Sequence, residues 1–218
     1  CNPDVLIYGG GDLLSTASKH STWMRRNLDR YKPRVKIAWG LGVSEKCRDQ
    51  ELLKSFTLFG IRNHKNHPQY KNYFHVPCAS CLHEEFSSID LNPQRDVGII
   101  HHKKAVMPQD SLLSTIIKPG EIVDEIVQSP STIQRTVQFI KSSKKIISNS
   151  FHGCYWAMLC GVPLIAVDVH RYREKMSQIH PELVPMRTQE APDYFRDTRF
   201  LQYCKDQNID FYSRVKYL

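Results

Sequence analysis

Residues 144–167 have the pattern of a buried strand, a polar turn, a helix and a second buried strand. The runs at 144–147 and 164–167 are short, apolar and β-branched, which favours strands covered on both faces. Between them, apolar residues repeat at helical spacing over 156–160, and Gly161 ends the helix where the next strand begins. This order of elements indicates a strand–helix–strand unit with parallel strands.

The turn of this unit collects Ser148, Asn149, Ser150 and His152. It lies beyond the carboxyl end of the first strand and at the amino end of the helix, where backbone N–H groups favour anions. Asn149 and Ser150 could cap the helix, orient a substrate or do both. His152 could donate to an anion or transfer a proton, against the alternative of a structural histidine held by the backbone. The turn is therefore a candidate phosphate or carboxylate site.

Strand and helix patterns alternate along the rest of the chain, which predicts an α/β fold of two Rossmann-like halves with parallel sheets. Predicted strands are 5–8, 35–39, 58–62 and 97–101, with a further apolar run at 122–127. Predicted helices are 18–31, 45–56, 132–140 and, in a polar and aromatic tail, 194–205. The polar, proline-containing segment 90–95 predicts a boundary between an N-terminal half, 1–95, and a C-terminal half with a helical tail, 96–218.

Three glycines follow the first predicted strand as Gly9, Gly10 and Gly11, and Asp12 comes next. The run lacks the Gly-x-Gly-x-x-Gly spacing of nicotinamide-binding proteins, so it indicates either a ligand-contacting turn through Gly10 and Gly11 or a tight turn alone. Asp12 could cap the following segment or act as an acid or base.

Two other strand ends carry candidate ligand-binding residues. Arg62 ends an apolar run, where its guanidinium could grip a carboxylate or phosphate through two hydrogen bonds, against the alternative of a surface salt bridge. His101 and His102 end the strand predicted at 97–101, and one of them is expected to face the ligand. His101 is the candidate.

Histidines and cysteines gather at His64, His67, His75, Cys78, Cys81 and His83. Four such ligands suit tetrahedral zinc, but only one Cys-x-x-Cys pair occurs and the spacing is not that of a zinc finger. We expect a packed turn with reduced thiols and no metal.

Composition restricts the partners. The chain of 218 residues has a formal net charge of +8, which favours an anionic partner, but its Lys and Arg are scattered, which argues against nucleic acid. No apolar run approaches the ~20 residues of a membrane span. An odd number of cysteines, 7, and the lack of any Asn-x-Ser/Thr site favour a reducing, cytoplasmic setting.

Three motifs occur in an order that resembles the polysaccharide pyruvyl transferase family. They are the strand and Gly-Gly-Gly turn at 4–12, the strand and Gly-x-Gly at 36–42, and the closing turn, helix, Gly-x-Pro and strand at 148–167. Two positions depart from the family pattern: Ser150 stands where many members have Arg, and Asn63 stands where Asp is usual after Arg62. The chain also opens at Cys1 without the family's upstream turn, so we interpret it as a fragment or a divergent, shortened member.

The resemblance implies a glycosyltransferase-B-like arrangement and transfer of pyruvate from phosphoenolpyruvate to two saccharide hydroxyls as a ketal, with no cofactor. It assigns His152 to proton donation or donor binding, Arg62 to the donor carboxylate or phosphate, and Asp12 to the acceptor hydroxyl. Glycosyl transfer from a sugar nucleotide and a degenerate, non-catalytic carbohydrate-binding protein remain as alternatives. The sequence leaves the acceptor sugar, its linkage and the oligomeric state open.

Overall fold

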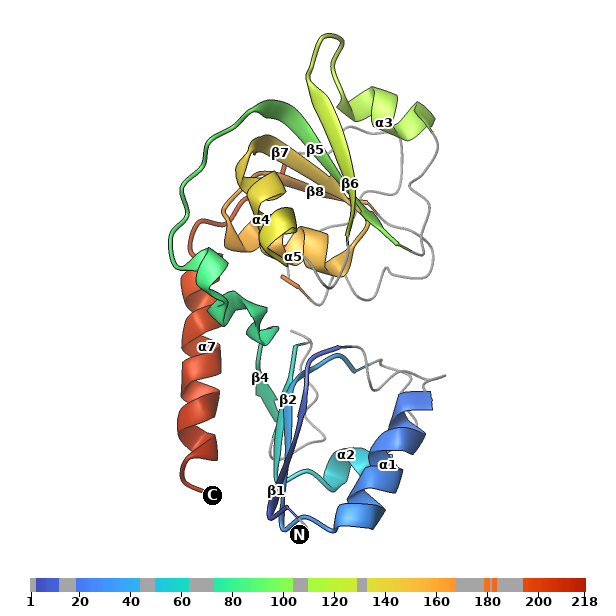
Figure 1. Ribbon diagram of the computed structural model, residues 1–218, viewed down its shortest axis with the longest axis vertical. Coiled ribbons are helices and arrows are strands. Elements are labelled where there is room, and N and C mark those ends of the chain that lie inside the picture. The colour runs from blue at the N-terminus through green and yellow to red at the C-terminus, as the bar shows by residue number, and fades with distance from the viewer. Residues whose placement is uncertain are drawn as a thin grey trace. The chain divides into compact units, whose positions relative to one another are not determined.

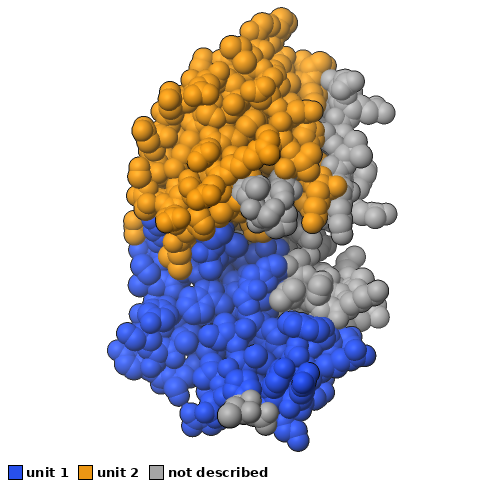
Figure 2. Space-filling view, viewed as in Figure 1, with its two compact units in different colours: residues 1–80, 204–218 blue, residues 81–203 orange. Residues whose placement is uncertain are grey.

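The computed structural model describes residues 3–11, 19–43, 50–62, 73–103, 110–128, 133–167, 179–180, 182–183 and 194–218. The chain divides into two compact units, which are coloured separately in Figure 2. Unit 1 comprises residues 1–80 and 204–218, and unit 2 comprises residues 81–203. The predicted boundary between two domains, 1–95 and 96–218, stays a prediction.

Unit 1 contains a sheet of four parallel strands in the order β1-β2-β3-β4. Its strands are β1 (Val5–Gly9), β2 (Val35–Leu41), β3 (Leu58–Ile61) and β4 (Tyr73–His75), and its first helices are α1 (Lys19–Tyr31) and α2 (Gln50–Lys54). Each crossover moves one strand further in the same direction. Because such crossovers are right-handed, α1 and α2 cover the same face of the sheet. There Met24 and Leu52 pack against Tyr8 and Phe59.

The opposite face of this sheet is covered by α7 (Phe200–Val215), the last helix of the chain (Figure 1). Phe211 packs with Val35 and Ile37 of β2 and lies edge-on to Trp39, with ring centroids 5.2 Å apart. The indole N–H of Trp39 donates to Asn208 Oδ1 at 2.8 Å. Segments almost the whole chain apart therefore form one core.

The tail helix differs from its prediction at 194–205. Phe195 exchanges two backbone hydrogen bonds with Leu164, each 2.9 Å long, so the chain is extended at Phe195, and the helix begins only at Phe200. It then continues to Val215 because Cys204, Asn208 and Phe211 recur at helical spacing and are all buried. Because one of these buried positions is the polar residue Asn208, the apolar pattern in the sequence did not reveal how far the helix extends.

Unit 2 contains a second sheet of four parallel strands, in the order β6-β5-β7-β8. Its strands are β5 (Arg95–His102), β6 (Val123–Gln128), β7 (Ser143–Ser148) and β8 (Leu164–Ala166). Its α-helices are α3 (Asp110–Ile116), α4 (Ile133–Lys141) and α5 (Phe151–Leu159), and two short 3-10 helices, Ala79–Leu82 and Glu84–Phe86, precede β5. The two parallel sheets confirm the predicted α/β class, whereas β4 and α3 had not been predicted.

Helices cover both faces of the second sheet. Ile116 of α3 packs with Val97, Ile99 and Ile147 on one face. Gly153 of α5 lies over Ile100 and Ser148 on the other. From β5 the chain crosses to β6 on one side, and from β6 it crosses back over β5 to β7 on the other side. The direction of winding therefore reverses between β5 and β7. The carboxyl ends of these two strands are a topological switch point, where open α/β sheets bind ligands.

Among the residues that the structure describes, no helix has both the length and the apolar character of a membrane span.

The dependence of unit 1 on α7 can be tested by replacing Phe211, which is 1% exposed, with Ala. Loss of a buried aromatic ring that contacts three strands should destabilise the protein by about 3–5 kcal/mol, measured by denaturant unfolding. Ile209→Ala on the same helix is the control, because Ile209 is 55% exposed and should cost far less. Equal losses in the two variants would contradict the assignment of α7 to the core.

Candidate functional site

The candidate site in unit 2 lies where β5 and β7 end. β5 finishes at His101 and His102, and β7 finishes at Ser148, followed by Asn149 and Ser150 before α5 begins. The register pairs Ile100 with Ser148, so the last residues of both strands are side by side. The predicted polar turn therefore occupies the switch point of the sheet.

Side-chain hydrogen bonds join this turn to β5. The Ser148 hydroxyl donates to the carbonyl of Ile100 at 2.9 Å and accepts from the N–H of Ser150 at 3.0 Å. Asn149 Oδ1 accepts from the backbone N–H of His102 at 2.7 Å. Since Ser148, Asn149 and Ser150 are all buried, these bonds fix the turn where the backbone ladder stops.

Ser150 is the N-cap of α5. Its backbone is extended, with φ −104° and ψ 134°, and its hydroxyl accepts from the N–H of Gly153 at 3.5 Å, a long bond. Its carbonyl accepts the first helical bond, from Cys154 at 2.9 Å. The structure thus gives Ser150 the capping role that the sequence offered as one of two possibilities. Contact with a substrate stays a prediction for Ser150 and for Asn149.

His152 is the second residue of α5 and is half-buried. Its ring lies 5.1 Å from the Trp156 ring and 5.3 Å from the Phe151 ring, measured between centroids. His152 thus belongs to the first turn of the helix, where the backbone N–H groups favour an anion.

His101 and His102 point to opposite faces of the sheet, as neighbouring residues in a strand do. His101 Nε2 lies 2.9 Å from Glu125 Oε2 of β6, on the face covered by α3. His102 is on the face of Ile100, which α5 covers. The sequence analysis chose His101 as the residue that faces the ligand. Because Ile99 and Ile100 are both apolar, the strand has no alternation of polar and apolar residues from which its two faces could be assigned.

The amino ends of the same strands are electrically neutralised. Lys144 Nζ lies 2.7 Å from Asp96 Oδ1, and Lys145 Nζ lies 2.8 Å from Glu121 Oε1. Hydrogen bonds from these lysines lower the pKa of both carboxyls, so both pairs are charged near neutral pH. Both lysines at this amino edge are already paired with carboxylates. The carboxyl edge of the sheet is therefore the better site for an anionic ligand.

Two buried thiols are inert: Cys154 in α5 and Cys160 at the C-cap of that helix. Burial raises the pKa of Cys154 and of Cys160 to about 12, so both are protonated at neutral pH and are poor nucleophiles. The cysteines in the described residues are free and buried, as expected for reduced thiols in a core.

In unit 1, the glycines form a turn at the carboxyl end of β1. Gly10 and Gly11 have φ of 67° and 71°, a conformation that other residues rarely adopt. Gly10 N–H donates to the Trp39 carbonyl at 3.0 Å, and Gly42 N–H donates to the Gly11 carbonyl at 2.8 Å. Among the described residues, a Cβ atom added at Gly9 or Gly10 would meet nothing within 4 Å.

Arg62 lies beside this turn, at the end of β3. Its side chain crosses Gly42 so closely that a Cβ atom there would lie 2.7 Å from Nη2. The residue is only 4% exposed, whereas the sequence left a residue at the surface as one alternative. A buried guanidinium is favourable only with hydrogen-bonding or anionic partners. Gly42 thus links the two, because its N–H bonds to Gly11 and the Arg62 side chain packs against it.

Several predicted residues lie outside the described part of the chain: Asp12, Asn63, His64 and His67. Of the remaining cluster, Cys78 Sγ lies 3.3 Å from Ser80 Oγ, and His83 Nδ1 accepts from the N–H of Glu85 at 3.2 Å. Within the described ranges, no three His, Cys, Asp or Glu side chains are grouped so as to hold a metal ion.

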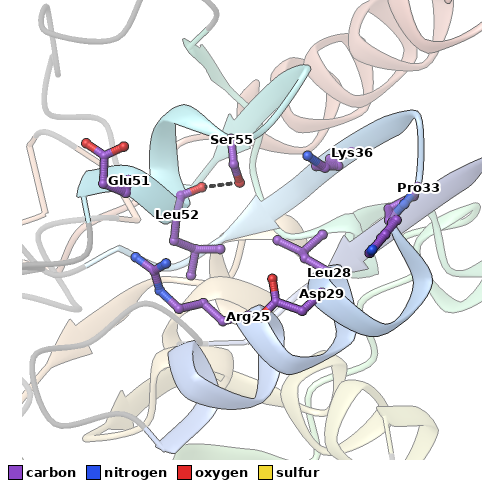
Figure 3. A pocket seen from close by; sticks show the side chains of 9 residues that line it. Arg25, Leu28, Asp29, Pro33, Lys36, Glu51, Leu52 and Ser55 are labelled. Atoms are coloured by element: carbon purple, nitrogen blue, oxygen red, sulfur yellow. Dashed lines mark hydrogen bonds between the residues drawn. The ribbon is translucent and has the colours of Figure 1, made fainter.

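A hollow of about 360 Å³ in unit 1 lies elsewhere (Figure 3). It is bordered by the second half of α1, by α2 and by the start of β2. Its lining is Arg25, Leu28, Asp29, Lys32, Pro33, Lys36, Glu51, Leu52 and Ser55. Helix carboxyl ends disfavour anions, and the hollow is at the amino edge of the sheet. It is therefore not the predicted anion site.

The second sheet defines an α/β unit of the kind that binds ligands at a switch point between parallel strands. A family model described as Polysaccharide pyruvyl transferase matches residues 2–171, so the chain belongs to that family. Searches of curated proteins and of solved structures each found no significant match.

The contact between Arg62 and Gly42 gives a direct test. Gly42→Ala should push the guanidinium aside at a cost of about 1–3 kcal/mol, because the displaced atoms end a flexible side chain. The Arg62 Nε–H signal in a nitrogen-15 NMR spectrum should shift, while the melting transition stays cooperative. Gly9→Ala, where a Cβ atom meets nothing within 4 Å, should leave the signal in place. An unmoved signal in Gly42→Ala would contradict this geometry.

Proposed function

We propose that this protein transfers pyruvate from phosphoenolpyruvate to a pair of hydroxyls on a saccharide, forming a cyclic ketal. The observation that carries the proposal is the position of the family's closing motif: its polar turn and His152 lie at the switch point of a parallel sheet. Membership of the family supports a saccharide as the acceptor.

The reaction needs one proton donor, one base and a site for a multiply charged anion. C3 of the enol takes a proton from an acid, and the oxygen of one hydroxyl bonds to C2 and gives its proton to a base. A second hydroxyl oxygen then bonds to C2 as the bond from C2 to the phosphate oxygen breaks, and the proton of this hydroxyl passes to the leaving phosphate. Phosphate leaves with the electron pair of that bond. The protein's part is acid–base catalysis and stabilisation of negative charge.

His152 is assigned as the acid or as a ligand of the donor, since its imidazole stands in the first turn of α5. Asn149, Ser150 and His101 are assigned to binding at the same edge of unit 2. In unit 1, Arg62 is assigned to the donor's carboxylate or phosphate, and Gly10 and Gly11 are assigned to contact with the substrate. Asp12 is assigned to the acceptor hydroxyl.

A glycosyltransferase-B-like classification, a cytoplasmic location and independence from any cofactor are parts of the same proposal. Glycosyl transfer from a sugar nucleotide is the second enzymatic candidate, because the same fold serves different reactions. A non-catalytic carbohydrate-binding role is favoured by one observation: Ser150, where many members have Arg, is a buried helix cap and brings no cation to the turn.

Phosphoenolpyruvate should raise the melting temperature of the wild-type protein, because a ligand that binds only the folded state stabilises it. A concentration 100 times the dissociation constant should add about 2.7 kcal/mol. Inorganic phosphate is the control for a weak, general anion effect. A rise with UDP-sugars and none with phosphoenolpyruvate would replace this proposal with glycosyl transfer.

His152→Ala should abolish transfer and leave the unfolding transition cooperative, because the half-buried ring is proposed to act on the substrate. The rate of phosphate release from phosphoenolpyruvate in the presence of an acceptor saccharide measures this. His83→Ala is the matched control, since His83 caps a 3-10 helix instead and should retain turnover. Wild-type turnover in His152→Ala would make His152 a structural residue.

A further inference from the structure

We propose that Trp156 and Phe151 are positioning residues that hold the imidazole of His152 in its working orientation; this inference rests on the proposed function. Trp156 follows His152 by four residues, so both side chains share one face of α5. Their ring centroids are 5.1 Å apart, with planes inclined by 35°. The Trp156 residue is only 4% exposed and so gives the imidazole a fixed surface.

Phe151 supplies a second contact of a different geometry. Its ring lies 5.3 Å from the imidazole and is nearly perpendicular to it, at 88°. Edge-to-face and tilted contacts at these distances are favourable for aromatic rings. Two rings inclined differently to the imidazole restrict its rotation more than either would alone.

The Phe151 ring is itself supported by the core of unit 2. It stacks on Tyr155 with centroids 6.0 Å apart, and Tyr155 lies edge-on to Phe200 at 5.7 Å. Tyr155 and Phe200 are buried, so this series of rings ends in close-packed protein.

The helix that carries these rings is fixed against the sheet. A Cβ atom at Gly153, the residue after His152, would overlap the Ser148 hydroxyl and would lie 3.0 Å from Ile100 Cγ2. The backbone of α5 therefore rests directly on β5 and β7. With the backbone fixed, the remaining freedom of His152 is rotation of its side chain, which the two rings limit.

Orientation matters because a general acid must lie within hydrogen-bond reach of the atom that it protonates. A displacement of about 1 Å can lower a rate by roughly 10²-fold. A positioning pair should therefore affect kcat more than the apparent affinity for the donor.

The test compares Trp156→Leu and Trp156→Phe in the full chain, with Phe151→Leu as a second variant in case the first fails to fold. Trp156→Leu and Phe151→Leu should each lower kcat by roughly 10- to 100-fold with little change in KM for phosphoenolpyruvate, and Trp156→Phe should restore much of the rate. Leu159→Ala, buried on the same helix, is the control for simple destabilisation.

A second readout does not depend on turnover. The carbon-bound imidazole protons of His152 should show ring-current shifts in the NMR spectrum that Trp156→Leu removes and Leu159→Ala preserves. Wild-type kcat together with unmoved His152 signals in both leucine variants would overturn the inference. If the wild-type protein releases no phosphate from phosphoenolpyruvate, the proposed function fails, and the His152 signals alone decide whether the rings position the imidazole.

Discussion

The hydroxyl of Ser148 holds the carboxyl edge of the second sheet together. It bonds to the Ile100 carbonyl of β5 and to the Ser150 N–H of the turn, and it fills the space against Gly153 that a larger helix residue would need. Strand, turn and helix therefore meet at one oxygen atom. The cap at Ser150, the first turn of α5 and the position of His152 all depend on this junction, since each follows within four residues of it.

The two sheets have the same number of strands, but their faces are covered in different ways. In unit 2 the reversal of winding at β5 places helices on both faces. In unit 1 the winding continues in one direction, so α1 and α2 share a face and the other would be bare. The tail helix α7 covers it with Phe211 and Val215.

Short β-branched runs made most strands predictable, because strands buried on both faces contain little else. What the sequence could not provide was information carried by contacts between distant residues. Nothing local marks Arg62 as buried, since its cover is the backbone of Gly42 twenty residues earlier. The limits of α7 were missed because Phe195 bonds to Leu164 and because Asn208 is buried by bonding to Trp39. The faces of His101 and His102 were equally hidden, since their strand is apolar on both sides.

The dependence of the first sheet on α7 has a consequence for the order in which this protein is made. Residues 81–203 emerge from the ribosome before Phe211 does, so unit 2 has all its residues available while one face of the first sheet still lacks its cover. Domains generally fold as units during synthesis, with the earlier one first. Here residues 1–80 must wait for residues 204–218, which are made after the whole of unit 2, and the apolar surface of β2 lacks its cover throughout that interval.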